Sequence, residues 1–126
     1  MQIYLSNSGQ EPIYAQITRQ IKQQILSGAL HPGDALPSIR LLAKELRISV
    51  ITTKRAYEEL EREGLIVTQT GRGSFVAEVS GERLREEQRR AVEKHLADAV
   101  HAAKMGGLTA EEFIEIAKTA FEEGEK

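Results

Sequence analysis

Apolar residues recur along most of this chain with the period of a helix. Between residues 13 and 26, isoleucine occupies every fourth position, at Ile13, Ile17, Ile21 and Ile25. This spacing predicts an amphipathic helix of about 15 residues with one apolar face. Pro12 suits the first turn of this helix, and Gly28 is expected to end it.

Two shorter helices are predicted after the Pro32-Gly33 turn. Ser38 and Ser49 are each placed to cap one of them by accepting a backbone N–H, and Gly64 is expected to end the second. The residues expected to face inward are Ile39, Leu42, Ala43 and Leu46 in the first helix, and Thr53, Ala56, Tyr57 and Leu60 in the second.

The pattern then changes to β-branched and aromatic runs at residues 65–69 and 74–79. The glycine-bearing loop Thr70-Gly71-Arg72-Gly73 lies between them, which predicts a β-hairpin. Two helices joined by a tight turn and followed by such a hairpin have the layout of a winged helix-turn-helix, a fold that binds DNA.

The tail is expected to form two more helices, one over residues 82–104 and one that begins at Thr109, where Glu112 completes a capping box. The last helix is expected to bury Phe113, Ile116, Ala117, Ala120 and Phe121. Because two helices cannot bury their apolar stripes alone, we expect them to pair across the axis of a homodimer. The candidate dimerisation residues are Leu84, Ala91, Val92, His95, Leu96, Ala99, Val100, Phe113 and Phe121.

The predicted fold class is therefore mostly α with a small β-hairpin, in two domains. Residues 1–78 form the winged helix-turn-helix, with residues 1–11 as an N-terminal arm. Residues 79–126 form a helical dimerisation domain.

The distribution of charge supports a nucleic-acid partner better than the total does. The chain carries 17 Lys and Arg against 19 Asp and Glu, a net charge of −2. Residues 38–55, however, hold five basic residues and a single acid, Glu45. A local positive face matters more for binding phosphates than the global sum, so double-stranded DNA is the expected partner.

Several other classes of function lack support in the sequence. The chain has no cysteine, which excludes thiol catalysis and cysteine-based zinc sites. His95 and His101 do not share a helix face, so no metal or other cofactor is expected. No catalytic grouping or phosphate loop is present, and we expect no enzyme. No apolar run of about 20 residues and no signal peptide occur, so a cytoplasmic location without membrane contact is expected.

Four motifs together resemble a known family. They are PIYAQI at 12–17, the G-x-L-x-P-G-D-x-L-P-S-x-R stretch at 28–40, EREGL at 61–65 and GRGSFV at 71–76. Residues 12–76 thereby resemble the DNA-binding domain of GntR-type bacterial transcription factors. The short tail resembles the YtrA-like branch of that family. This resemblance implies a dimeric regulator, more commonly a repressor, whose target genes often encode transport systems.

In a helix-turn-helix, the second helix places its N-terminal residues on base edges in the major groove. The resemblance implies contacts from Arg40, Thr52, Lys54 and the Gly71 wing tip, and an arginine at position 40 can bond guanine or phosphate bidentately. Ser38 and Ser49 are helix caps first. The candidate DNA-contacting residues are Ser38, Arg40, Ser49, Val50, Thr52, Lys54, Arg55, Thr70, Gly71 and Arg72.

Three alternatives stay open at this point. Val50, where many family members have arginine, forms an apolar pair with Ile51 that could contact a thymine methyl group or pack on a neighbouring helix. The winged helix could instead bind another protein. A small-molecule effector has little room for a pocket of about 300 Å³ in a two-helix tail, but could bind at a dimer interface or between domains.

Overall fold

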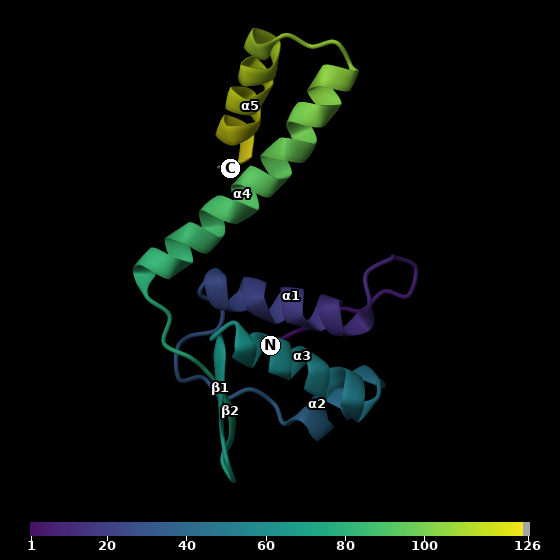
Figure 1. The fold of residues 1–126 in the computed structure, drawn as a ribbon, viewed down its shortest axis with the longest axis vertical. Coiled ribbons are helices and arrows are strands. Elements are labelled where there is room, and N and C mark those ends of the chain that lie inside the picture. Colours follow the sequence, from purple (N-terminus) through teal and green to yellow (C-terminus); the bar gives the residue numbers. More distant parts are fainter. Residues whose placement is uncertain (125–126) are drawn as a thin grey trace. The chain divides into compact units, whose positions relative to one another are not determined.

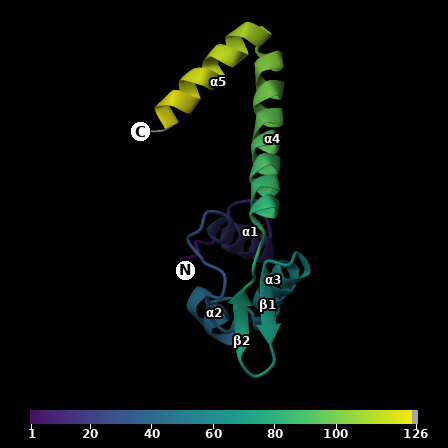
Figure 2. The same ribbon diagram turned by 90° about the vertical axis from the view of Figure 1, so that its left-hand side faces the viewer.

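The structure, a computed structural model, describes residues 1–124 and divides into two compact units. The first unit covers Met1–Leu84, and the second begins at Arg85. In the described residues, no helix has the length and apolar character needed to cross a membrane. The elements, shown in Figures 1 and 2, are α1 (Ile13–Leu26), α2 (Ile39–Leu46), α3 (Val50–Arg62), β1 (Ile66–Gln69), β2 (Gly73–Val76), α4 (Gly81–Met105) and α5 (Ala110–Gly124).

The predicted fold class is confirmed, and the helices α1, α2 and α3 share one apolar core (Figure 1). Ile17 and Ile21 of α1 are fully buried, as is Leu60 of α3. Burial of one such side chain stabilises the fold by about 1.5–3 kcal/mol. The four-residue spacing of isoleucine therefore predicts the buried face of α1 correctly.

The hairpin contains the two predicted strands, but the second is shorter than expected. β1 and β2 pair antiparallel, with Val67 opposite Phe75. β2 ends at Val76, so the expectation of a strand through Val79 is wrong. On its other edge, β2 is paired by the segment before α2, where the Gly33 N–H donates to the Val76 carbonyl at 2.8 Å. This pairing, which includes a bridge between Ala35 and Phe75, ties the wing to the loop that leads into α2.

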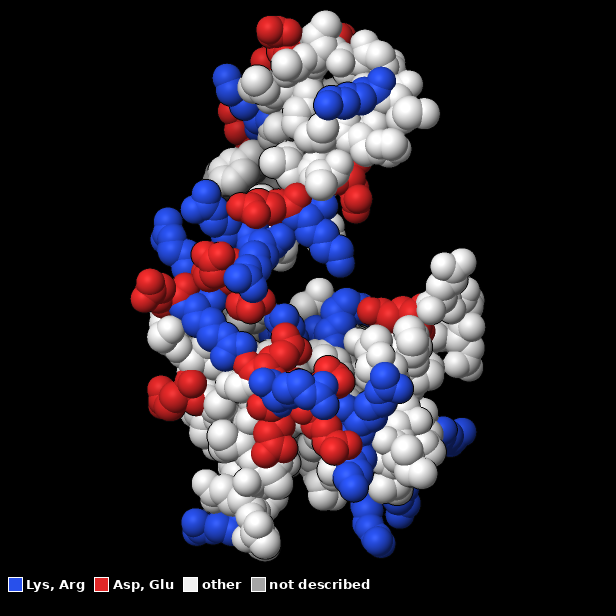
Figure 3. All heavy atoms as spheres, in the orientation of Figure 1, with Lys and Arg blue, Asp and Glu red and all other residues white. Residues whose placement is uncertain are grey.

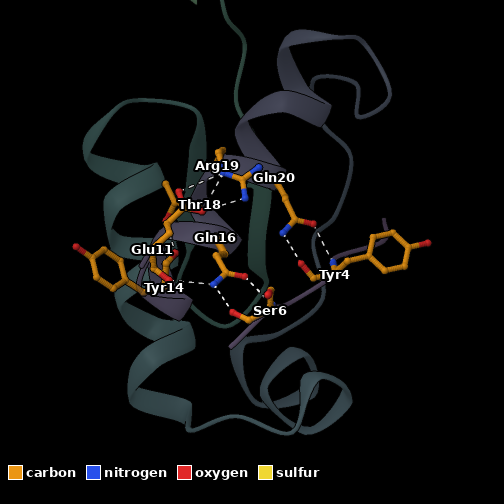
Figure 4. Close-up of polar contacts among 8 residues, drawn as sticks. All are labelled: Tyr4, Ser6, Glu11, Tyr14, Gln16, Thr18, Arg19 and Gln20. Carbon is orange, nitrogen blue, oxygen red and sulfur yellow. Dashed lines mark hydrogen bonds and ion pairs between the residues drawn. The ribbon is translucent and has the colours of Figure 1, made fainter. Parts of the chain in front are cut away.

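The N-terminal arm is held along α1 by a row of glutamines (Figure 4). Gln20 accepts from the Tyr4 N–H at 2.9 Å and donates to the Tyr4 carbonyl at 2.7 Å. Gln16 pairs in the same way with Ser6, at 2.9 and 2.8 Å. The spacings match, because four helical residues rise about 6 Å and two extended residues about 6.6 Å.

The C-terminal unit has no core of its own. Of residues 85–124, only Ala103 is buried. α4 and α5 make few contacts beyond their connection, and they diverge from it in Figure 2. No described element covers the stripe of α5 within a single chain, so the expected burial of this stripe depends on the predicted second copy. Phe113 is half-buried, whereas Ile116, Ala117, Ala120 and Phe121 are exposed.

Candidate nucleic-acid interface

Two serine caps begin the helices of the helix-turn-helix, as the sequence predicts. The Ser38 hydroxyl accepts from the Leu41 N–H at 3.1 Å, and the Ser49 hydroxyl accepts from the Thr52 N–H at 3.0 Å. The Ser49 hydroxyl also donates to Thr52 Oγ1 at 2.7 Å, so Thr52 keeps its own hydroxyl hydrogen for another acceptor. Both helix N-termini are exposed, and such termini attract anions.

The turn between α2 and α3 depends on a left-handed residue. Arg47 has a φ of 56°, and it is the one non-glycine residue with positive φ in residues 1–124. The Ile48 N–H then donates to the Ala43 carbonyl at 3.0 Å, which closes the end of α2. The chain can therefore enter α3 two residues later.

Tyr57 ties α3 to the segment that begins α2. Its hydroxyl donates to the Pro37 carbonyl at 2.7 Å. Burial, with a smaller effect from the charge of Glu45, raises the pKa of this phenol. The hydroxyl therefore stays protonated, and the bond that positions the α2 N-terminus persists at any ordinary pH.

The start of α3 presents an exposed apolar pair. Ile51 is 80% exposed and Val50 is also exposed, while Thr53 and Ala56 face the core. Packing on a neighbouring helix is therefore excluded for Ile51 within this chain. The cation Lys54 follows one turn after Val50 on the exposed side.

The ten Lys and Arg residues of the first unit fall into two groups. Three form ion pairs with glutamates at 2.6–3.0 Å, and Arg83 donates to the Glu63 carbonyl. The other six have no carboxylate partner among residues 1–124; they are Arg40, Lys44, Arg47, Lys54, Arg55 and Arg72. We call these six the unpaired cations. In Figure 3, blue side chains project at the lower end of this unit, while red ones gather above them.

The wing tip is a glycine turn that carries one of the unpaired cations. The Arg72 N–H donates to the Gln69 carbonyl at 2.9 Å, and Gly71 has a φ of 78°. A Cβ added at Gly71 would meet nothing within 4 Å. Glycine is therefore needed here for its backbone conformation, and the exposed tip is open to a partner.

Residues 13–76, about half of the chain, match the family described as bacterial regulatory proteins, gntR family. The chain belongs to the GntR family. Family membership makes it a DNA-binding transcription regulator.

Other GntR-type regulators resemble this chain beyond the winged helix. The HTH-type transcriptional repressor YtrA of Bacillus subtilis is 38% identical over 104 residues, which cover 82% of this chain and 80% of that protein. A GntR family transcriptional regulator from Listeria monocytogenes is similar in structure, with a TM-score of 0.72 and 32% identity over 91% of this chain and 98% of its own. These matches include the tail and confirm the resemblance to the YtrA-like branch.

The structural neighbours include complexes with DNA. The DNA-binding domain of AraR, in complex with operator ORX1, has a TM-score of 0.55 and 26% identity. It covers 61% of this chain and 96% of its own.

The predicted DNA-contacting residues of this GntR chain all lie in the first unit, at the starts of α2 and α3 or at the wing tip. All are exposed except Thr52, which is half-buried under the Ser49 hydroxyl. The predicted dimerisation residues are divided. Leu84 is half-buried in the first unit, whereas the other eight lie on α4 and α5 of the second, where only Val100 and Phe113 are half-buried.

Sequence reasoning missed two side chains within the PIYAQI motif. Gln16 holds the arm by its hydrogen bonds to Ser6. The Tyr14 ring lies under the guanidinium of Arg55, with 3.8 Å between the ring centre and the guanidinium carbon. The four-residue spacing of Gln16, Gln20 and Gln24 was a usable signal for the arm. No local sequence pattern predicts the Tyr14 contact, because Arg55 lies far along the chain.

Proposed function

We propose that this GntR regulator is a homodimeric repressor that binds a pseudo-palindromic operator. The observation that carries the proposal is the group of unpaired cations at α2, the start of α3 and the wing tip. Within residues 1–124, no ion pair has to break before these side chains meet phosphates, so their charge is available for counterion release from DNA. The printed name of the similar Bacillus subtilis protein, a repressor, supports the sign of regulation.

In this proposal, α3 enters the major groove with its N-terminal residues on base edges. Lys54 and Arg40 contact guanine or phosphate, and Thr52 offers its free hydroxyl hydrogen to an acceptor. The exposed pair Val50-Ile51 contacts thymine methyl groups. Ser38 and Ser49 add hydroxyls beside phosphates, and the wing tip of Thr70, Gly71 and Arg72 approaches the minor groove.

The dimer part of the proposal rests on the uncovered apolar faces of the tail. Phe121 is 73% exposed and Leu96 46% exposed, so α4 and α5 leave apolar stripes open to water. α5 carries a groove of about 320 Å³ whose accessible surface is almost entirely apolar. Its lining residues are Phe113, Ile114, Ala117, Lys118, Phe121 and Glu122. A second copy of the same tail has the matching stripe to fill it.

We assign this groove to the second subunit because one helix supplies all of its lining. Binding of a small-molecule effector, at a dimer interface or between domains, stays an open alternative. We also propose that residues 1–78 are the DNA-binding domain, that residues 79–126 are the dimerisation domain, and that the protein acts in the cytoplasm. Its target genes are proposed to encode transport functions, as the resemblance to the YtrA-like branch implies.

Salt dependence tests the DNA-binding proposal. We expect the full-length chain to bind a fluorescein-labelled random duplex at 50 mM salt, and the affinity to fall about 100-fold or more by 200 mM if several phosphates are contacted. No binding at 50 mM salt, or an affinity that is indifferent to salt, would instead favour a winged helix that binds another protein.

A further inference from the structure

A tyrosine of α1 lies directly against the proposed DNA-reading helix. The guanidinium carbon of Arg55 is 3.8 Å from the centre of the Tyr14 ring. Arg55 is exposed and Tyr14 is half-buried, so the ring forms a floor on which the cation lies. An arginine stacked in this way keeps the N–H groups at its edge available for an acceptor.

This contact stands at one end of a fixed seam between α1 and α3. The next residue along the seam, Thr18, donates from its hydroxyl to the Tyr14 carbonyl at 2.9 Å and approaches the Ala56 carbonyl at 3.5 Å. One turn further, Lys22 pairs with Glu63 at 2.9 Å. These contacts set the two helices side by side, so the position of the Tyr14 ring relative to α3 is determined by the fold.

The charge of Arg55 is not used in an ion pair within the described part of the chain. Among residues 1–124, no carboxylate pairs with it. Arg62, two turns later on the same side of α3, pairs with Glu59 at 2.6 Å, and Arg19 pairs with Glu11 at 3.0 Å. Arg55 therefore combines a restricted side chain with a cation that lacks an internal partner.

We propose that Tyr14 is a positioning residue that holds Arg55 for a contact with a DNA phosphate beside the recognition helix. The proposal rests on the proposed function as a DNA-binding regulator. An arginine side chain that moves freely loses rotamer freedom when it binds. Stacking on the Tyr14 ring restricts Arg55 before binding, so the entropy cost of the DNA contact is lower. Arg55 is exposed and directly follows Lys54 on α3, the helix that enters the major groove in the proposed function. We place its contact on a phosphate, so the contact is independent of sequence.

Fluorescence anisotropy with the full-length chain tests this role at several salt concentrations. The probes are two labelled duplexes of about 30 base pairs, one with the site that the chain selects and one of random sequence. We expect Tyr14→Leu to weaken binding to both by about fivefold and Tyr14→Phe, which keeps the ring, to change it less than about twofold. Arg55→Gln should weaken binding and reduce the slope of log affinity against log salt by about 1.

Two matched variants control for the chemistry of each change. Tyr4→Leu removes an exposed ring from the arm, and Arg62→Gln removes a paired cation from α3; both are expected to leave affinity unchanged. In the Arg55→Gln background, Tyr14→Leu should have no further effect. Arg55→Lys keeps the charge without the planar stack. It should therefore lose affinity about as Tyr14→Leu does, with an unchanged salt slope. This variant tests the stack even if Tyr14→Leu fails to fold.

Equal losses from Tyr14→Leu with and without Arg55 would overturn the positioning role. An unchanged salt slope in Arg55→Gln would overturn the phosphate contact while leaving the regulator proposal intact. Absence of duplex binding by the unaltered chain at 50 mM salt would overturn both.

Discussion

At the scale of single residues, the surroundings of each cation show whether its charge is used in an ion pair of the fold or is available to a partner. Arg40 lies in the first turn of α2, next to the Ser38 cap, and is exposed without a carboxylate partner in residues 1–124. Arg19 is also an exposed helical arginine, but Glu11 accepts from it at 3.0 Å, which raises the pKa of Arg19 through that hydrogen bond. The same residue type thus has two different environments within one unit.

Arg40→Gln is expected to weaken binding to the selected duplex by about tenfold or more, because a bidentate contact is lost. Arg19→Gln removes an equal charge from a paired site and is expected to have little effect. Anisotropy titrations of both variants in the same buffer check this. Equal losses for the two would mean that only total charge matters, and would contradict a specific role for Arg40.

Local chemistry explains why the caps and the exposed cations could be predicted. Ser38 and Ser49 act on N–H groups three residues away, so the sequence alone contains the interaction. The partner of Arg55 is different, because the Tyr14 ring reaches it only after α1 and α3 have packed. The helix period already placed Ile51 outside the buried stripe of α3. That no neighbouring helix covers Ile51 needed the structure, in which it is 80% exposed.

At the scale of elements, the N-terminal arm is held to α1 by glutamine side chains that bond its backbone. Gln16 is only 4% exposed, and its amide donates to the carbonyls of Ser6 and Glu11 at 2.8 and 3.0 Å while accepting from the Ser6 N–H. Ile3 and Leu5, which alternate with the bonded residues, pack against the core. The arm therefore behaves as an extended strand whose partner is a row of glutamines on α1.

Gln16→Ala is expected to lower the free energy of unfolding by about 2 kcal/mol, because it removes the three hydrogen bonds that a buried side chain makes to the backbone of the arm. Gln23→Ala, on the exposed side of the same helix, is the matched control with an expected change near zero. Urea denaturation of both variants measures the difference. Similar stabilities for the two would show that the arm is not held by Gln16.

The capping box of α5 gives a prediction about pH. The Thr109 N–H donates to the Glu112 carboxylate at 3.0 Å, and this backbone bond is the main cause of a lowered Glu112 pKa. Because the folded pKa lies below the ordinary value of 4.5, the bond supports α5 above that pH and is lost as the pH falls through the folded pKa. A carboxyl NMR titration should give a midpoint below 4.5; a midpoint at or above 4.5 would contradict the box.

The helices were predictable to within about two residues because stripes and caps are local signals. The pairing of residues 33–36 with β2 was not predictable, because the Leu36 N–H donates to the carbonyl of Ser74, far along the chain, at 2.9 Å. No periodic pattern of residues 33–36 marks a strand. β2 ended early for a related reason, since Ala77 turns to donate to the Leu65 carbonyl at 2.9 Å.

At the scale of the whole molecule, the two units differ in what holds them together. The first has a shared core built from α1, α2, α3 and the hairpin. The second has apolar stripes on α4 and α5 and a single buried residue, Ala103, within residues 85–124. The sequence pattern identified the stripes, but a stripe does not say whether its cover comes from the same chain. Phe121 is exposed in one chain, so its expected burial requires the second copy that we propose.

Leu96→Asp is expected to weaken dimerisation by about 100-fold or more, because a carboxylate would enter an apolar interface without a partner. Operator binding should weaken with it, since one winged helix reads only one half-site. Ala97→Asp adds the same charge to α4 off the stripe and is expected to leave the dimer intact. Sedimentation velocity over a range of concentrations checks both. Stable dimers of Leu96→Asp with unchanged affinity would remove the tail from the proposed interface.

Selection of binding sites from random duplex DNA with the full-length chain tests the central claim most directly. A dimeric reading head predicts enrichment of an inverted repeat whose half-site centres lie about one helical turn, or a multiple of it, apart. Two copies of the chain should bind each selected duplex. Enrichment of no sequence, or of a single half-site bound by one copy, would contradict the account.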